Sequence, residues 1–267
     1  MKIITWNIQS GGAARIPRIV AHLADDGSDV VVLMEYRPYA ASGDRLREAL
    51  RQHGWRYQEE MPQSSERHAV LAASRTPLVR VEEDLGLDLP ADLLSYARAR
   101  WVEVRVPAWT VPAPDPLADP LPLTIAGVHV PGSDDKPGLA GKAAFWDALL
   151  DWAARRSTQP AIMLGDFNSG LRIDEGGPTS LDCKRHLLRL CDELGWHDAS
   201  RVQHGETREY TYYSRQGGGY HLDHAWLSPV VQGRLRASTH QHHVRAVHKL
   251  SDHSALSIEI KVDGHAA

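Results

Sequence analysis

The chain has 267 residues, 42% of them hydrophobic and 24% charged, and this ordinary globular composition excludes a wholly disordered protein. Its 30 Lys and Arg residues against 34 Asp and Glu residues give a formal net charge of −4. That balance argues against a protein that coats nucleic acid through bulk positive charge, although a local basic groove is compatible with it. No stretch approaches the ~20 apolar residues of a membrane-spanning helix.

The N-terminal segment and the cysteines indicate the compartment. Residues 1–7 lack the apolar core and small-residue cleavage site of a signal peptide. The two cysteines, Cys183 and Cys191, lie in a segment that favours a helix, where a rise of ~1.5 Å per residue separates them by about 12 Å. A disulfide requires Cα atoms within about 7 Å, so we expect free thiols in a soluble cytoplasmic protein.

Strand and helix patterns alternate along the chain. Helices are expected at 16–25, 44–52, 142–155 and 181–194, where apolar residues recur at helical spacing. Strands are expected at 2–6, 30–34, 69–73, 101–106, 123–130, 161–164, 210–213, 221–227 and 255–262. The continuous apolar run at 30–34 is typical of a strand that is buried on both faces.

A proline-rich segment interrupts this pattern between Pro107 and Pro122. Strand-like residues flank it, so we expect a stiff, irregular loop at the tip of a hairpin rather than a domain linker. No repeat and no domain boundary is visible. The chain therefore predicts one domain over residues 1–262, with a tail at 263–267 and helices packed outside paired sheets.

Polar residues repeatedly stand at the ends of the predicted strands. They are Asn7, Glu35, His129, Asp166, Asn168, Asp223, Asp252 and His253. Any one of them could be a helix cap or a loop anchor. An interior carboxylate such as Asp223 is harder to explain in that way, because a buried charge needs a partner. Strand ends converge on one edge of a sheet, so we expect these residues to share a site.

The chemistry of this set points to a phosphate ester. Carboxylate and amide oxygens are hard ligands suited to Mg²⁺ or Mn²⁺. Histidines supply proton transfer or hydrogen bonds to phosphate. The sequence therefore predicts metal-assisted hydrolysis of a phosphate ester.

Five ordered motifs make the prediction more specific. They are Thr5-Trp6-Asn7-Ile8, Met34-Glu35, Gly165-Asp166-Phe167-Asn168, Leu222-Asp223-His224 and Ser251-Asp252-His253. Together they resemble the signature of the endonuclease/exonuclease/phosphatase superfamily, over nearly the whole chain. The C-terminal motifs look most similar to the exonuclease III and apurinic-endonuclease branch. The resemblance implies an α/β fold, a four-layer sandwich of two packed β-sheets flanked by helices.

The resemblance also implies a role for each motif residue. Glu35 is the expected principal metal ligand, with Asn7 and Asp252 beside it. Asp166 is expected to orient or deprotonate the attacking water, and Asn168 to hold a phosphate oxygen. His253 is expected to bind the scissile phosphate, with its ring fixed by Asp223 in a carboxylate–imidazole pair. The expected catalytic residues are thus His129, Asp166, Asn168, Asp223 and His253, and the expected metal ligands are Asn7, Glu35 and Asp252.

His129 departs from the apurinic-endonuclease pattern, in which a tyrosine is usual at this position. A histidine there resembles the deoxyribonuclease-like and phosphatase branches. His129 could protonate the leaving oxygen, or it could only contact phosphate or close the hairpin. This difference bears on the substrate more than on hydrolysis itself.

Further side chains are candidates for substrate binding. Arg75 and Arg100, with Arg67 and His68, lie near strands that reach the cleft in this fold and could contact phosphates. Tyr212 and Tyr220 flank a glycine-rich segment and could stack on a base. Solvated arginines and ordinary strand packing explain these residues equally well. His240, His242, His243 and His248 follow no recognisable zinc spacing and are expected on the surface.

The leading hypothesis is a Mg²⁺- or Mn²⁺-dependent nuclease that cleaves DNA phosphodiester bonds by direct attack of water. Endonuclease and 3′-exonuclease activity both fit, and DNA repair is a role that such activity would serve. The alternative is hydrolysis of a small ester such as an inositol phosphate, a phospholipid headgroup or a nucleotide. A catalytically silent binding protein is disfavoured because the site residues are all present. DNA is the expected partner of a monomer that does not bind membranes.

Overall fold

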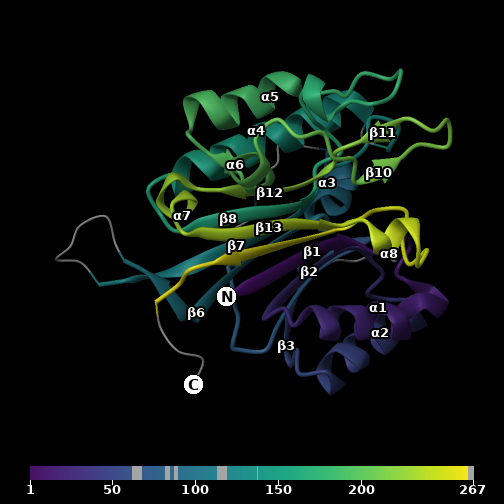
Figure 1. Cartoon of the computed structure of the whole chain (residues 1–267), viewed down its shortest axis with the longest axis vertical. Coiled ribbons are helices and arrows are strands. Elements are labelled where there is room, and N and C mark those ends of the chain that lie inside the picture. Colours follow the sequence, from purple (N-terminus) through teal and green to yellow (C-terminus); the bar gives the residue numbers. More distant parts are fainter. Residues whose placement is uncertain (62–67, 82–84, 87–89, 113–118, 137, 264–267) are drawn as a thin grey trace.

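The computed structural model describes residues 1–61, 68–81, 85–86, 90–112, 119–136 and 138–263. Two six-stranded sheets lie face to face, and helices cover the outer face of each, so the chain forms four layers (Figure 1). This arrangement confirms the expected α/β sandwich.

The first sheet combines strands from both ends of the chain, and the second takes its strands from the middle. The first sheet contains, in spatial order, β13 (Leu235–Gln241), β14 (Ala255–Ile260), β1 (Lys2–Asn7), β2 (Val30–Tyr36), β4 (Ala69–Ser74) and β3 (Tyr57–Glu59). The second contains β5 (Val79–Arg80), β6 (Trp101–Val111), β7 (Leu121–His129), β8 (Ala161–Asp166), β12 (Asp223–Leu227) and β9 (His197–Asp198). A separate hairpin joins β10 (Tyr212–Tyr213) to β11 (Gly219–Tyr220).

Each sheet is covered on its outer face by its own set of helices. The first sheet is covered by α1 (Ile16–Asp26) and α2 (Ala41–Gln52), and the second by α3 (Ala91–Arg98), α4 (Gly138–Arg156) and α5 (Lys184–Leu188), which continues into a π-helical turn at Arg189–Glu193. Shorter helices are α6 (Ala199–His204), α7 (Pro229–Gln232) and α8 (His243–Ala246), with 3₁₀ turns at Ala13–Arg15 and Arg172–Asp174. None of the helices in the described ranges combines the length and apolarity that a membrane crossing requires.

The alternation of side chains along β2 explains the layering. Val30, Val32 and Met34 face the other sheet and join the core between the two sheets. Val31 and Leu33 face outward and pack with the residues of α1 and α2. All five side chains are fully buried, which accounts for the uninterrupted apolar run in the sequence.

The proline-rich segment contains more regular structure than the sequence predicts. Strand β6 continues past Pro107 to Val111, and β7 already begins at Leu121. The ladder between them shifts register between Val106 and Thr110, and this irregularity accommodates Pro107. Residues 113–118, at the centre of the segment, lie outside the described residues.

The helix expected at 181–194 begins later and changes type. Cys183 has a φ of 63°, a left-handed conformation that ends any helix there, and α5 starts at Lys184. Both cysteines are free thiols, as expected. The strands expected from 210 and 221 begin two residues later, at Tyr212 and Asp223.

Candidate active site

Polar residues meet at one edge of the second sheet because of the strand directions. Strand β7 runs parallel to β8, and both reach this edge with their carboxyl ends. Strand β12 is antiparallel to β8 and reaches the same edge with its amino end. Asp166 at the end of β8 therefore lies between His129 of β7 and Asp223 of β12, in register with both.

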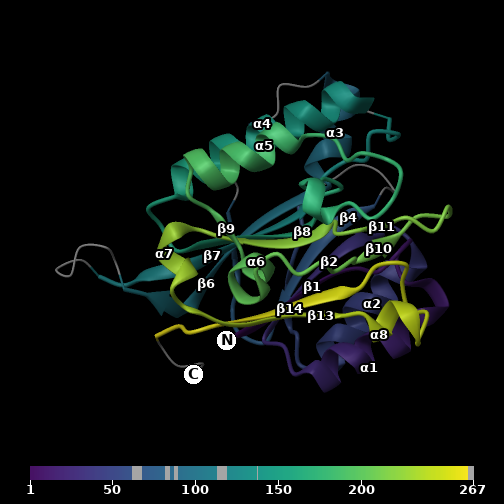
Figure 2. The ribbon, with the colours of Figure 1, turned by 45° about the horizontal axis from the view of Figure 1, so that its top comes forward.

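The first sheet brings its own polar residues to the same end of the sandwich. Strands β1 and β2 are parallel and end near Asn7 and Glu35, whereas the antiparallel β14 begins just after His253. In Figures 1 and 2 the hairpin β10–β11 and α8 lie at this end of the sheets, away from the N-terminus.

These strand ends surround a pocket of about 370 Å³. Its lining consists of Asn7, Glu35, His68, Arg100, His129, Gly132, Asp135, Asp166, Asn168, Tyr212, Leu222, Asp252 and His253. The structure thus brings together every residue expected to bind metal. It also brings together every residue expected to be catalytic except Asp223, which lies directly behind His253.

One side chain joins the two sheets inside the pocket. Nδ2 of Asn7 donates a hydrogen bond to Oδ2 of Asp166 at 3.0 Å and lies 3.3 Å from Oε1 of Glu35. Oδ1 of Asn7 accepts the backbone N–H of Gln9 at 3.0 Å. Because Asn7 belongs to the first sheet and Asp166 to the second, this amide fixes the two halves of the pocket against each other.

Glu35 has a backbone conformation that favours glycine, with a φ of 58°. It lies where the pairing between β2 and β4 shifts register, between Leu33 and Tyr36. Its Oε2 accepts the backbone N–H of Ser10 at 2.6 Å and lies 3.5 Å from Nδ1 of His68. A left-handed non-glycine residue costs about 1–3 kcal/mol, and here that conformation coincides with a carboxylate in the pocket lining.

The imidazole of His253 lies between two buried carboxylates. Its Nδ1 is 2.9 Å from Oδ2 of Asp223, and its Nε2 is 3.8 Å from Oδ2 of Asp166. Burial disfavours the charged ring, but the two carboxylates outweigh it and raise the pKa of His253 to about 10. His253 is therefore an imidazolium at neutral pH, with an N–H available on the side of the pocket.

Asp166 is poised to exchange a proton near neutral pH. Burial raises the pKa of its carboxyl to about 6, although the charge of His253 opposes this change. Oδ1 of Asp166 accepts the backbone N–H of Asn168 at 3.0 Å, and Oδ2 accepts from Asn7. A carboxylate in this range can accept a proton from water, which is the property that a general base requires.

His129 pairs with Arg100 at the wall of the pocket. Nη1 of Arg100 lies 3.0 Å from both ring nitrogens of His129. Nη2 of Arg100 lies 3.2 Å from Oδ2 of Asp135 and donates to the hydroxyl of Tyr96. Burial first, and then the charge of Arg100, hold the pKa of His129 well below its usual range. This neutral state favours a contact with phosphate over proton donation to a leaving group.

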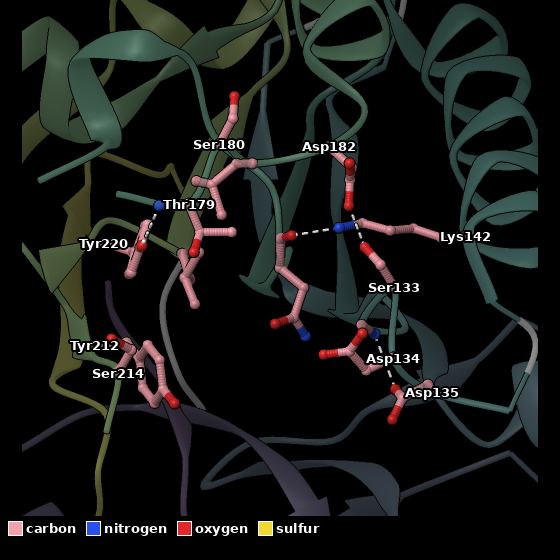
Figure 3. A pocket seen from close by; sticks show the side chains of 14 residues that line it. Ser133, Asp134, Asp135, Lys142, Thr179, Ser180, Asp182, Tyr212, Ser214 and Tyr220 are labelled. Carbon is pink, nitrogen blue, oxygen red and sulfur yellow. Dashed lines mark hydrogen bonds between the residues drawn. The ribbon is translucent and has the colours of Figure 1, made fainter. Parts of the chain in front are cut away.

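Asn168 is held from three sides. Its φ of 46° is left-handed, its N–H donates to Asp166, and its Nδ2 donates to the carbonyl of Val130 at 2.9 Å. The buried Nζ of Lys142 donates to the Asn168 carbonyl at 2.6 Å, a bond drawn in Figure 3. The sequence does not mark Lys142 as a site residue, because a lysine in an amphipathic helix is usually solvated.

A second recess of about 440 Å³ opens beside the pocket and shares Asn168 and Tyr212 with it (Figure 3). The hairpin pairs Tyr212 with Tyr220. The Tyr212 ring lies 4.9 Å from the His253 ring at an angle of 33°. Tyr220 lines the recess, where its hydroxyl accepts the N–H of Thr179 at 3.3 Å (Figure 3).

Arg75 lies outside this pocket, contrary to the sequence-based expectation. It follows β4, which runs antiparallel to β2, so it lies at the opposite edge from Glu35. Its Nε and Nη1 donate to the carbonyls of Ser28 and His53 at 3.1 and 2.9 Å, and its guanidinium stacks on Trp55 at 4.4 Å. These contacts account for Arg75 without a substrate.

Other pocket residues were less visible in the sequence. His68, a candidate for contact with phosphate, lines the pocket, whereas its neighbour Arg67 lies outside the described residues. Asp135, Gly132 and Leu222 also line it. Asp135 follows the end of β7 by a few residues, so the strand-end pattern could have found it.

The donors on the first-sheet side fit a hard divalent cation. Glu35 and Asp252 bring carboxylate oxygens to one pocket lining, and Asn7 lies beside Glu35 with its Nδ2 3.3 Å from Oε1. Oγ of Ser251 donates to the Asn7 carbonyl at 2.6 Å and lies 3.4 Å from Oδ1 of Asp252, which keeps Asp252 beside Asn7. Carboxylate oxygens such as these suit Mg²⁺ or Mn²⁺ rather than a softer metal.

Comparison with known families agrees with this geometry. Residues 4–253 match the model of the Endonuclease/Exonuclease/phosphatase family. The chain belongs to this family. Its members are phosphoesterases that typically depend on a divalent metal, and the matched range contains every residue placed in the pocket. A search of curated proteins finds no match to the sequence.

Solved structures with the same fold come from the nuclease branch. The 3′-5′ exonuclease NExo from Neisseria meningitidis is 25% identical with a TM-score of 0.76, over 98% of this chain and 100% of that one. A 3′ phosphatase NExo variant from Neisseria, bound to a product DNA hairpin, is 23% identical with a TM-score of 0.76, over 98% and 99%. An AP endonuclease from Archaeoglobus fulgidus is 19% identical with a TM-score of 0.70, over 98% and 100%.

Proposed function

We propose that the protein is a divalent-metal-dependent phosphodiesterase that hydrolyses DNA, as an endonuclease, a 3′-exonuclease or both. The observation that carries this proposal is the imidazolium of His253, held between Asp223 and Asp166 in the pocket that Asn7, Glu35 and Asp252 also line. A fixed positive charge, a carboxylate of near-neutral pKa and a hard-metal site are the parts that phosphate-ester hydrolysis by water requires.

Asp166 has the position of the general base. It accepts hydrogen bonds from Asn7 and from the Asn168 backbone, which orient its carboxylate in the pocket. A water molecule that donates to Asp166 gives up its proton as its oxygen attacks phosphorus, and the ester oxygen leaves on the opposite side. No covalent enzyme intermediate is needed.

The charge that develops on the phosphoryl oxygens is stabilised by His253 and Asn168. Asp223 fixes the His253 ring so that Nε2–H faces the pocket. A hydrogen bond from this N–H to a phosphoryl oxygen strengthens as that oxygen gains negative charge. Asn168 keeps a second amide proton for a phosphate oxygen after its bond to Val130. Neutral His129 and the charged Arg100 line the same pocket and contact the phosphate from the second sheet.

Glu35, Asn7 and Asp252 would hold the metal ion, which supplies stabilisation of the leaving oxyanion when it is bound. Asn7 also contacts Asp166, so the metal side and the water side of the site are mechanically linked.

The preference for DNA rests on the nuclease relatives and on the neighbouring tyrosine. Tyr212 lines both cavities beside His253 and offers a ring on which a base can stack. One observation favours the alternative, a small phosphate ester. The adjoining recess is lined by Asp134, Asp135 and Asp182, and these carboxylates repel an extended anionic backbone.

A cleavage assay separates the two substrates. Labelled single-stranded, double-stranded, abasic and 3′-phosphorylated DNA would be incubated with the protein and Mg²⁺ or Mn²⁺. His253→Ala is the inactive variant, and His248→Ala, which changes an exposed histidine, is the matched control. We expect metal-dependent products that only His253→Ala abolishes. Intact DNA together with turnover of a nucleotide or inositol phosphate would refute the DNA assignment.

A further inference from the structure

A second group of histidines and carboxylates lies on the other face of β12, outside the pocket. Asp198, His221 and His224 are 4%, 1% and 2% exposed, and they come from β9, the segment before β12, and β12 itself. Each offers one ligand atom, and these atoms all lie within 4.8 Å of one another. Helix α6 packs on β12 and β13 next to this group (Figure 1).

The hydrogen bond on the far side of His221 leaves one ring nitrogen free. Nε2 of His221 lies 3.0 Å from the carbonyl of Asp223 and must donate to it. Nδ1 then carries a lone pair, and it is buried with no hydrogen-bond partner among the described residues. The nearest acidic oxygen, Oδ1 of Asp174, is 3.6 Å away and already accepts from Arg201. A buried ring nitrogen without a hydrogen-bond partner calls for an explanation, and a bound ion is one that fits the neighbouring ligand atoms.

His224 is oriented in the same way. Its Nε2 lies 3.3 Å from the carbonyl of Ser169, and its Nδ1 lies 2.5 Å from Oδ2 of Asp198. The rings of His221 and His224 stack with centroids 4.4 Å apart and planes 4° from parallel. In metal sites, histidine ligands characteristically donate their other ring N–H to a carbonyl or carboxylate, as both rings do here.

Asp198 turns one carboxylate oxygen, Oδ2, toward the group. Its Oδ1 caps α6 by accepting the N–H groups of Ser200 at 2.7 Å and Arg201 at 3.4 Å. Its Oδ2 contacts only His224 among the described residues. Asp198 also lines a cavity of about 510 Å³, whereas His221 and His224 do not.

We propose that Asp198, His221 and His224 form a structural site for a transition-metal ion, and that the ion is Zn²⁺. Two imidazoles and one carboxylate suit Zn²⁺ and disfavour Mg²⁺, which prefers oxygen ligands. On binding, Zn²⁺ takes the place of the proton shared by His224 and Asp198, which passes to solvent. Water completes the coordination. Because His221 holds the Asp223 carbonyl, the ion would stiffen the segment that carries this catalytic carboxylate.

The test is a Zn²⁺ titration of the metal-free full-length protein in excess Mg²⁺, monitored by calorimetry. The decisive variant is Asp198→Asn, because asparagine also caps a helix and removes only the charged ligand. Glu35→Gln, altered in the catalytic pocket, is the matched control. We expect about one tight Zn²⁺ per wild-type chain, unchanged in Glu35→Gln and at least about 100-fold weaker in Asp198→Asn.

Substitution of Co²⁺ for Zn²⁺ gives a measurement that needs no variant. Tetrahedral Co²⁺ with imidazole ligands absorbs strongly in the visible range, whereas an octahedral oxygen site does not. Equal Zn²⁺ affinity in wild type and Asp198→Asn, loss of binding in Glu35→Gln, or a weak octahedral Co²⁺ spectrum would each overturn the proposal. Zinc in the catalytic pocket alone would then explain any binding.

Discussion

Two neighbouring residues of β12 form two carboxylate–imidazole pairs on opposite faces of one strand. Asp223 contacts His253 at 2.9 Å toward the pocket, and His224 contacts Asp198 at 2.5 Å on the helical side. All four residues are buried. The side-chain pairs are chemically alike, so their surroundings decide what each pair can do.

The pocket pair borders groups that can react, whereas the other pair is enclosed. Beside His253 lie Asp166 and the half-buried Tyr212, both of which line an open cavity. Around His224 lie the rings of Phe167 and Trp226, at 5.8 and 5.5 Å. An Asp–His pair therefore marks a catalytic site only when a substrate can reach the free nitrogen of the imidazole.

The largest expected effect comes from breaking one pair and leaving the other intact. Asp223→Asn removes the charge that keeps His253 protonated and oriented, so we expect kcat to fall by about 10³–10⁴-fold. Asp198→Asn retains the cap of α6 and should change kcat by less than about tenfold. Steady-state hydrolysis with circular dichroism as a folding check measures both. Equal losses of kcat in the two variants would show that both substitutions act by destabilising the fold around β12.

Glu35→Gln tests the first-sheet side of the pocket. Replacing the carboxylate with an amide weakens the oxygen-ligand set, so we expect turnover to fall by about 10²–10³-fold and the half-saturating Mg²⁺ concentration to rise. Activity measured over a Mg²⁺ series checks this. Wild-type turnover at saturating Mg²⁺ would remove Glu35 from the ligand set.

His129→Tyr probes the third histidine of the pocket. A neutral ring that only contacts phosphate can be replaced by a phenol, so we expect about a tenfold loss in kcat and unchanged DNA binding. The test is a comparison of kcat with binding measured by fluorescence anisotropy. Complete loss of hydrolysis with normal binding would instead identify His129 as an obligatory proton donor.

Arg75→Ala addresses the opposite edge of the first sheet. The variant loses the stack on Trp55 and two hydrogen bonds to carbonyls, so we expect a loss of about 1–2 kcal/mol in unfolding free energy. Turnover should stay within about twofold of wild type. Urea denaturation and the DNA assay measure the two quantities. A large loss of activity without destabilisation would return Arg75 to the substrate site.

The smallest effect is expected at a partly exposed carboxylate–imidazole contact, Glu209 with His240. The hydrogen bond from His240 lowers the pKa of Glu209 to about 2, below the ordinary value of about 4.3. A lowered carboxyl pKa stabilises the fold above the ordinary value, and this contribution disappears as the pH falls towards 2. Solvent screening keeps it below about 1 kcal/mol.

We therefore expect the wild type to lose more stability than Glu209→Gln between pH 5 and pH 2. Urea midpoints of both proteins over this range provide the measurement. Parallel pH profiles would contradict the lowered pKa of Glu209.

The sequence predicts the layered fold and most of the pocket for the same reason. Long apolar strands such as β2 are recognisable without tertiary information, and a polar residue at the end of each strand lies at a sheet edge. Asp166 and His253 were found in this way. The ordered motifs then added the roles of these residues, which strand position alone does not give.

What the sequence could not provide depends on strand direction and on contacts between distant segments. Arg75 also follows a strand, but β4 is antiparallel and carries it to the wrong edge. His240 was expected on the surface, yet its ring packs 4.7 Å from His221. Neither placement follows from local spacing. The position of Arg75 depends on the direction of β4, and that of His240 on the contact between β13 and the segment before β12, which exists only in the folded sandwich.

The hydrogen bond from Asn7 to Asp166 has a consequence for biosynthesis. The first partner lies at the start of the chain, the second beyond its middle, and His253 follows near its C-terminal end. A chain that stops short of His253 lacks both the imidazolium and strand β14. Hydrolysis at this site therefore requires that these three distant segments have come together, so activity reports that the sandwich is assembled.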